Sequence, residues 1–300
     1  FGAVAAIGRL AGFDARQMKD AFGAQYSQTS GTLQAHAEGS PMLGMQVGLN
    51  ARAAIVSADL AAAGFRGPHD ILVGQYGYFR LFEQDDHDID AFLPSLGNEW
   101  QILNMSHKPY PSGRLTHGAI DGLGQLMQRH GFAADDIETI EALVPPLVHR
   151  LVGRPILENP EANYAKLCLA FVVGTFLARG NVDVPYFRGQ ALNDPAVQRY
   201  GQCVSVVLDS NPDLNALDPQ RITVKLRDGT RHVCDLSYVY GHPKNPLSEA
   251  ENLAKFRRCA EYASVPLTIV AQDCLIAAID GLETLDNIAD LMALSRGASL

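Results

Sequence analysis

The sequence predicts an α+β fold that is mainly α: a discontinuous all-helical domain with an inserted α+β lid domain. Three observations lead to this prediction. Residues 1–100 show helical patterns, residues 101–245 mix helical and strand patterns, and residues 246–300 return to helical patterns. We therefore expect residues 246–300 to pack back on residues 1–100, with residues 101–245 forming the lid.

The composition excludes several classes of protein. The chain has 300 residues, of which 47% are hydrophobic, and 33 acidic against 24 basic side chains give a net charge of −9. This is a globular composition, long enough for about two domains. The acidic balance argues against nucleic-acid binding, which requires cations facing phosphates. No apolar run reaches the ~20 residues that a membrane span needs, so we expect no membrane partner.

The chain begins with a helical pattern. Phe1, Val4 and Ile7 recur at helical spacing, and Gly12 follows where the helix is expected to end. There is no initial Met and no basic segment of the signal-peptide kind. We therefore expect the chain to be a piece of a longer protein.

Two further helices are predicted before residue 100. Asp14 and Gln17 have the spacing of a capping box, which predicts a helix from residue 15 onward. An alanine-rich helix is expected over residues 46–63, with Gly64 just beyond its end. Helices so rich in alanine can approach one another closely, as in a packed helical domain.

The lid region combines both types of element. Helices are expected over residues 116–130, before Gly131, over residues 160–179, and after Asp194. Alternating residues predict a strand at 140–144, and a β-branched run predicts another at 203–209.

A hairpin is also expected in the lid region. Residues 221–226 and 231–236 flank Asp228-Gly229, the dipeptide typical of a tight hairpin turn. Beyond the lid, Ser248 and Glu251 form a second capping box, and helical periods follow over 267–279 and 285–294.

The cysteines are scattered. Their number is odd, and their spacing matches neither a disulfide framework nor a zinc or iron–sulfur motif. We interpret them as small core residues of a protein in the reducing cytoplasm. They are Cys168, Cys203, Cys234, Cys259 and Cys274.

The densest candidate site is the segment 106–117. It holds two cations, two histidines, a phenol and three hydroxyls without a carboxylate, and its prolines keep it out of helix. The helix expected from Thr116 offers backbone N–H groups to an anion, so the segment is suited to cradle a carboxylate. Lys108 and His117 are groups there that can transfer protons. Composition alone favours the alternative, a basic surface turn with Ser112 or Thr116 as a helix cap.

Two other segments are weaker candidates. The polar run 25–31, which includes Ser30, suits either a cleft lining or a capping turn. The acidic stretch 83–90 contains His87 and could attract a metal ion, but it is more typical of a solvated loop.

Several motifs follow one another along the chain: Phe1–Ala6, Ser27–Gly31, Ala61–Pro68, Tyr76–Phe82, Lys108–Pro111 with Thr116–His117, and Asn245–Ser248. In this order they resemble the motifs of the MmgE/PrpD family, and the resemblance covers essentially the whole chain. The segment around Lys108 is the most specific of these motifs. The family includes 2-methylcitrate dehydratase, cis-aconitate decarboxylase and iminodisuccinate epimerase.

The resemblance implies a helical domain interrupted by an α+β lid, with the active site in the cleft between them. It further implies a homodimer and an enzyme that uses no metal or iron–sulfur cofactor. Lys108 matches the position of a catalytic or substrate-binding lysine. From the motifs we predict catalytic roles for Lys108 and His117, and substrate-binding roles for Tyr110, Ser112, Arg114, Ser30 and Gln46.

Two departures from the family pattern stand out. The family's N-terminal third, which supplies an acidic residue and histidines to the site, is absent from this sequence. In the stretch 39–48, Leu43 stands where many members have a lysine and Gln46 where they have a histidine. Loss of a cation and a titratable group should change substrate preference.

The resemblance implies a lyase or an isomerase acting on a small di- or tricarboxylate by general acid/base chemistry. Dehydration of a 2-methylcitrate-like hydroxy acid, a hydro-lyase reaction, is the leading expectation. Decarboxylation of the cis-aconitate type and epimerisation of the iminodisuccinate type are the alternatives on the same fold. A third alternative is a catalytically silent binding protein.

Overall fold

A computed structural model describes residues 1–296 of the chain. It confirms the predicted α+β, mainly helical class. The chain divides into two compact units, a first unit of Phe1–Ile102 and a second unit that begins at Leu103.

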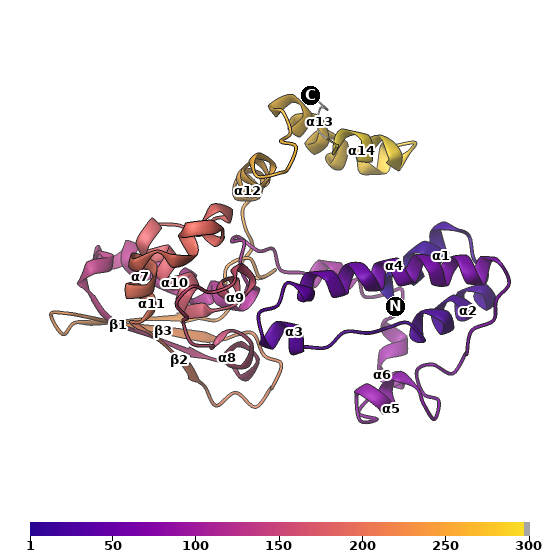
Figure 1. Ribbon diagram of the computed structural model, residues 1–300, viewed down its shortest axis with the longest axis horizontal. Coiled ribbons are helices and arrows are strands. Elements are labelled where there is room, and N and C mark those ends of the chain that lie inside the picture. The colour runs from indigo at the N-terminus through magenta and orange to yellow at the C-terminus, as the bar shows by residue number, and fades with distance from the viewer. Residues whose placement is uncertain (297–300) are drawn as a thin grey trace. The chain divides into compact units, whose positions relative to one another are not determined.

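All the regular elements of the first unit are helices (Figure 1), and small side chains fill its core. Val4, Ala21, Ala54 and Ala61 form that core, so the helices approach closely. A Cβ atom at Gly23 would lie only 2.2 Å from the carbonyl oxygen of Pro68. The helices are α1 (Gly2–Leu10), α2 (Ala15–Tyr26), α3 (Gln34–Ala37), α4 (Met42–Ala62), α5 (Tyr78–Phe82) and α6 (Ile89–Phe92).

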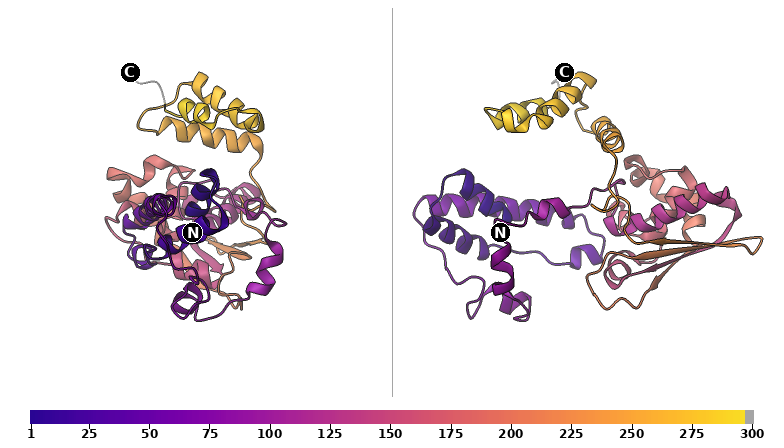
Figure 2. Two further views of the ribbon diagram at one scale, coloured as in Figure 1. Left: turned by 90° about the vertical axis from the view of Figure 1, so that its right-hand side faces the viewer. Right: turned by 180° about the vertical axis from the view of Figure 1, so that it is seen from behind.

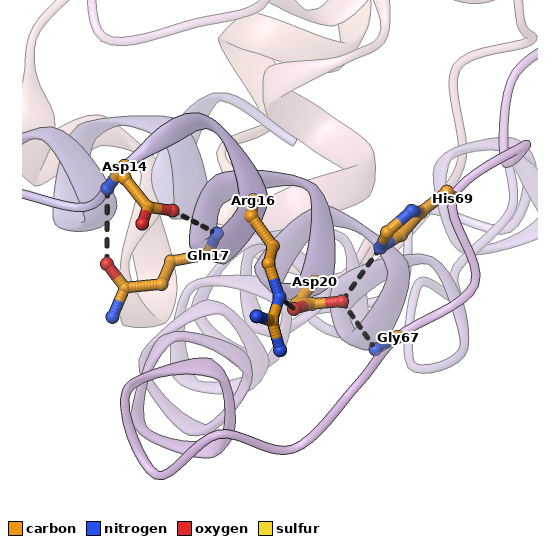
Figure 3. Close-up of polar contacts among 6 residues, drawn as sticks. All are labelled: Asp14, Arg16, Gln17, Asp20, Gly67 and His69. Atoms are coloured by element: carbon orange, nitrogen blue, oxygen red, sulfur yellow. Dashed lines mark hydrogen bonds and ion pairs between the residues drawn. The ribbon is translucent and has the colours of Figure 1, made fainter.

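Polar contacts organise α2, as Figure 3 shows. The predicted capping box is confirmed. The backbone N–H of Gln17 donates to Asp14 Oδ1 at 2.7 Å, and the backbone N–H of Asp14 donates to Gln17 Oε1 at 3.1 Å. Further along, the buried Asp20 carboxylate accepts from His69 Nε2 at 2.8 Å and from the Gly67 N–H at 3.2 Å. The hydrogen bond from His69 lowers the pKa of Asp20. The segment that follows α4 is thereby tied to α2.

The second unit contains a four-stranded mixed sheet in the order β2-β1-β3-β4. The central pair β1–β3 is antiparallel and β1–β2 is parallel. The predicted hairpin is confirmed, because β3 and β4 pair antiparallel on either side of Asp228-Gly229. The strands are β1 (Ile137–Val144), β2 (Val204–Leu208), β3 (Gln220–Leu226) and β4 (Arg231–Leu236).

Helices cover one face of this sheet. In Figures 1 and 2, α7, α10 and α11 lie on the same side of the strands. Leu123 of α7, Val173 of α10 and Ile140 and Ile222 of the sheet belong to one buried core. As predicted, α7 ends at Gly131, whose positive φ of 71° closes the helix. The helices are α7 (His117–His130), α8 (Pro146–Val152), α9 (Ala162–Lys166), α10 (Leu169–Arg179) and α11 (Pro195–Gly201).

One sequence prediction is wrong in this region. Instead of a single helix over residues 160–179, the structure has α9 and α10 with a break between them. Cys168 is extended at the break, with φ −103° and ψ 109°. The carbonyl of Lys166 accepts the N–H of Gly113 at 2.8 Å, so a tertiary hydrogen bond takes the place of helix continuation.

Three helices follow the sheet: α12 (Glu249–Glu261), α13 (Ile269–Asp280) and α14 (Ile288–Leu294). The capping box of Ser248 and Glu251 is confirmed, and an ion pair of 2.7 Å between Arg257 and Asp273 joins α12 to α13. These helices fall within the second unit. Their packing on residues 1–100 stays a prediction, and residues 297–300 of the predicted C-terminal segment lie outside the described residues. Within residues 1–296, no helix is both long and apolar enough to span a bilayer.

Candidate functional site

The segment that carries Lys108 is anchored at both ends by backbone hydrogen bonds. The His107 N–H donates to the Gly241 carbonyl at 2.8 Å, and the Gly113 N–H donates to the Lys166 carbonyl at 2.8 Å. Gly241 has a φ of +90°, and a Cβ there would lie 2.0 Å from the His107 carbonyl oxygen. Only glycine at position 241 therefore allows the two segments, at His107 and at Gly241, to approach so closely.

The anchored segment is non-helical, as the prolines predict. Pro109 is buried and Pro111 is partly buried. A 3-10 turn, Arg114–Thr116, then leads into α7. The site segment therefore runs directly into the helix that covers the sheet.

Behind the segment lies a buried chain of hydroxyls and an imidazole. The Thr116 hydroxyl donates to the Gly113 carbonyl at 2.8 Å, so Thr116 Oγ1 is free to accept from Ser112 Oγ at 3.0 Å. Ser112 Oγ then accepts from His117 Nε2 at 3.1 Å. This direction of donation places the imidazole proton on Nε2. The lone pair on His117 Nδ1 is buried without a hydrogen-bond partner among residues 1–296.

The surroundings keep His117 and Tyr110 uncharged. Burial lowers the pKa of His117 to about 3, and the positive charges of Arg114 and Lys108 add to that shift. The Tyr110 ring meets the imidazole edge to face, with centroids 5.3 Å apart and planes at 89°. Burial raises the pKa of Tyr110 to about 12. Both rings are therefore neutral at physiological pH.

The charges of three cations, Lys108, Arg114 and Lys255, act on one another here. Lys108 is exposed and Lys255, from α12, is partly buried. The pKa of Lys108 is nevertheless lowered, by partial desolvation first and then by the charges of Lys255 and Arg114. Arg114 donates to the Val239 carbonyl at 3.3 Å, while its Nε is buried and makes no hydrogen bond within the described chain. Burial lowers the pKa of Arg114 as well.

The nearby carboxylates are engaged with other groups. Asp121 accepts the Tyr240 N–H at 3.0 Å and the Gln125 amide at 2.9 Å. Asp218 accepts the Val239 N–H at 3.0 Å, and Glu251 accepts from Ser248. Among residues 1–296, no ion pair within 4.0 Å uses any of the three cations. Cations whose charges act on one another, with no direct ion pair, favour an anionic ligand.

The remaining two predicted site residues lie in the first unit. Ser30 and Gln46 both line a cavity of about 980 Å³. Asn50 holds the Ser30 turn: its Nδ2 donates to the Ser30 carbonyl at 2.9 Å, and the Ser30 N–H points to Asn50 Oδ1 at 3.4 Å. The Gln46 amide donates to the Thr32 carbonyl at 3.3 Å.

The predicted site residues therefore fall into two groups in the structure. Ser30 and Gln46 lie together in the first unit, and the other five lie together in the second. That the two groups serve one site stays a prediction.

Sequence reasoning missed Asn50 and Lys255. Asn50 follows Gln46 by four residues on α4, so helical spacing offered a signal. Lys255 follows the capping residue Glu251 by four residues on α12, which is a similar signal. The effect of its charge on the pKa of Lys108 depends on tertiary structure and has no local signature in the sequence.

Comparison with known protein families identifies the chain. A model of the MmgE/PrpD C-terminal domain matches residues 110–273, and a model of the MmgE/PrpD N-terminal domain matches residues 1–89. The chain belongs to the MmgE/PrpD family. The resemblance inferred from the motifs is confirmed, and the C-terminal domain match begins at residue 110, two residues after Lys108.

The chain is also similar to individual proteins, each of them named cis-aconitate decarboxylase. The chain is 26% identical to a cis-aconitate decarboxylase of Mus musculus over 85% of its own length and 52% of the relative's. It is 25% identical to that of Homo sapiens over 99% of its length and 61% of the relative's. It is 22% identical to that of Aspergillus terreus over 96% of its length and 61% of the relative's. The MmgE/PrpD chain therefore spans between half and two thirds of the curated relatives it matches.

Proposed function

We propose that this MmgE/PrpD protein is a lyase acting on a small polycarboxylate, with decarboxylation of a cis-aconitate-like tricarboxylate as its reaction. The observation that carries the proposal is the pair of cations Lys108 and Arg114, neither of them in an ion pair within the described residues, beside a buried, neutral layer. The activity that the relatives are named for supports decarboxylation over the dehydration that is the leading expectation from the sequence.

The chemistry requires charge stabilisation at one carboxylate and not at another. One carboxylate leaves as CO₂, and its bonding electron pair shifts into a new carbon–carbon double bond. The electron pair of the original double bond takes a proton at the carbon next to a retained carboxylate. A cation beside the leaving carboxylate would stabilise the ground state and oppose this step. Lys108 and Arg114 therefore act on the retained carboxylate, where negative charge develops.

The residues divide into binding and positioning roles. Lys108 is the exposed ammonium with a lowered pKa, suited both to bind a carboxylate and to deliver a proton. His117 is buried and neutral, so we propose that it acts by positioning Ser112 and Tyr110. A directly catalytic His117 stays a prediction from the sequence, as do substrate contacts by Ser30 and Gln46. The homodimer and the cytoplasmic location likewise remain predictions.

A substrate panel tests the proposed reaction. The intact protein is incubated separately with cis-aconitate, 2-methylcitrate and iminodisuccinate, and products are followed by NMR and CO₂ release. Decarboxylation of cis-aconitate is the expected result. Water loss from 2-methylcitrate alone would replace decarboxylation by dehydration, and inversion of iminodisuccinate alone would indicate the epimerase alternative. No turnover and no ligand-induced thermal stabilisation would contradict the enzyme proposal and favour a silent protein.

A further inference from the structure

The cavity of about 980 Å³ in the first unit has aromatic side chains in its lining, namely Phe1, Tyr78 and Phe82. The Tyr78 ring contacts both of the others. Its centroid lies 5.4 Å from that of Phe82 with the planes at 28°, and 6.0 Å from that of Phe1 with the planes at 84°. Rings that pack on one another in this way present a stiff apolar surface. The apolar body of a ligand can therefore lie against this part of the lining.

A second part of the lining consists of uncharged polar groups. Asn50 is occupied in holding them, since its Nδ2 donates to the carbonyls of Ser30 and Gln46 at 2.9 and 2.8 Å. The Gln46 amide nitrogen donates to the Thr32 carbonyl at 3.3 Å. Within residues 1–296, Gln46 Oε1 and the Ser30 hydroxyl make no hydrogen bond, although both residues line the cavity. An acceptor and a hydroxyl therefore remain for a ligand.

A buried amide also lines the cavity. Gln25 is only 2% exposed. Its Oε1 lies 3.3 Å from the Ser57 hydroxyl oxygen, and its Nε2 donates to Thr29 Oγ1 at 3.4 Å. An amide nitrogen carries two hydrogens, so one N–H of this side chain has no partner among the described residues. An unpaired buried donor costs free energy, which an oxygen atom of a ligand in the cavity would recover.

The charge of the lining disfavours a carboxylate. Among the described residues that line the cavity, Glu83 has the one charged side chain, and none is lysine, arginine or histidine. A bound carboxylate would lose its water without gaining a cation and would be repelled by Glu83. Glu83 is exposed and already accepts from the Tyr78 hydroxyl at 2.7 Å, so water weakens its attraction for a cation as well. An uncharged ligand fits this lining best.

We propose that the cavity of the first unit binds a small uncharged molecule that joins an apolar body to a primary amide. The body lies against Tyr78 and Phe82, the amide oxygen accepts from Gln25 Nε2, and the amide nitrogen donates to Gln46 Oε1. This role goes beyond the proposed reaction and does not depend on it. If Ser30 and Gln46 contact the substrate, as the motifs predict, they contact an uncharged part of it.

Three probes of similar size and different charge test the preference: benzamide, benzoate and benzylammonium. Each is titrated into the intact protein, and binding is followed by NMR at the side-chain amide resonances of Gln25 and Gln46, so that an anion bound near Lys108 is not counted. Benzamide should bind more tightly than either charged probe by about tenfold or more. A charged probe that binds as tightly as benzamide at these resonances would overturn the proposal. So would the absence of any shift with all three probes.

Removal of the free acceptor supplies the second readout, taken at the Gln25 resonance. Gln46→Leu should weaken benzamide binding about 3- to 10-fold, the value of a neutral hydrogen bond. Gln34→Leu is the matched control, because Gln34 is an exposed glutamine of α3 outside the lining, and it should leave binding unchanged. Equal affinities in Gln46→Leu and the wild-type protein would contradict the proposed contact.

A change of charge in the lining should reverse the preference. Leu43→Lys brings a cation into the cavity, so benzoate should then bind more tightly than benzamide. Leu49→Lys adds the same charge on α4 outside the lining and should keep the original order. An unchanged order in a Leu43→Lys variant with the wild-type melting temperature would show that charge does not set the preference, and the proposal would be wrong.

This proposal and the proposed reaction fail in different ways. If benzamide binds as expected but no substrate of the panel is converted, the proposed reaction is wrong and the role of the cavity stands. If cis-aconitate is decarboxylated but benzamide shifts neither Gln25 nor Gln46, the role of the cavity is wrong and the reaction stands.

Discussion

The two groups of predicted site residues are held in place by different means. In the second unit, the Lys108 segment is fixed by backbone hydrogen bonds at His107 and Gly113 and by a glycine contact at Gly241. In the first unit, the Ser30 turn is fixed by a side-chain amide, that of Asn50, on a helix with few buried residues.

This difference predicts where sequence change is tolerated. The Lys108 segment depends on a packed core, so most changes behind it alter both stability and geometry. The Ser30 turn depends on the partly buried amide of Asn50, whose replacement costs about 1 kcal/mol. The departures from the family pattern at Leu43 and Gln46 lie in the second kind of region, where substrate preference can change without loss of the fold.

Substitution of Lys108 should have the largest effect on activity. Lys108→Met removes the ammonium placed where charge develops, and loss of one such group typically lowers kcat by about 10²–10³. The side chain is exposed, so the melting temperature should change by no more than about 2 °C. Steady-state kinetics on cis-aconitate and differential scanning calorimetry measure the two quantities.

Lys225→Met is the matched control for this substitution, since it removes a lysine charge at a site on the sheet. It should leave kcat unchanged. Near-normal turnover in Lys108→Met would show that the segment is the basic surface turn considered from composition.

Gly241→Ala should reduce activity through geometry. A Cβ at this position meets the His107 carbonyl oxygen at 2.0 Å, and the φ of +90° is unfavourable for alanine. The segment next to Lys108 must move, and we expect kcat/KM to fall by about 10- to 100-fold. Gly229→Ala is the control, because its φ is also +90° but its Cβ would meet nothing within 4 Å. Equal loss of activity in both variants would mean that backbone strain, and not the contact with His107, is responsible.

Local signals predicted most elements of the fold. The hairpin follows from Asp228-Gly229 between alternating segments, and α7 follows from its apolar period and Gly131. The break between α9 and α10 could not be predicted, because the Lys166 carbonyl bonds to Gly113, a residue far away in the sequence. Tertiary hydrogen bonds of this kind produce no periodic pattern in the sequence.

For the candidate site, too, the sequence predicted what depends on neighbouring residues but not what depends on tertiary structure. The motif brought Lys108, Tyr110 and Arg114 together because they are neighbours in sequence. The burial and neutral state of His117 depend on helix α7 lying over the sheet, which sequence spacing does not encode.

Acidification tests the buried layer behind Lys108. The pKa of His117 is about 3 in the folded protein and ~6.5 in the unfolded chain, so the unfolded chain binds a proton first as pH falls. Stability contributed by this group is therefore present above pH ~6.5 and is lost progressively below it. The loss is on the order of 1 kcal/mol per pH unit. Urea unfolding at pH 7.5, 6.0 and 5.0 measures it.

His117→Gln sharpens that experiment, since the amide can still donate to Ser112 Oγ but does not titrate. The variant should lose about 1–2 kcal/mol at pH 7.5. Its stability should then depend less on pH than that of the wild-type protein. Parallel curves for the two proteins would show that another group dominates, and His117 would not be the buried neutral imidazole described above.

The smallest effect is expected at Asn50, in the amide-held turn. Asn50→Ala removes the hydrogen bonds to Ser30 and to the Gln46 carbonyl at 2.8 Å, at a cost of about 1 kcal/mol. If Ser30 contacts substrate, KM should rise about two- to fivefold with kcat nearly constant. Asn50→Asp keeps the shape but brings a carboxylate to 2.9 and 2.8 Å from two carbonyl oxygens, so it should be at least as harmful as alanine. A loss above about 100-fold in Asn50→Ala would mean that the turn is as demanding as the Lys108 segment. An aspartate variant that matches the wild type would show that the amide does not hold the turn.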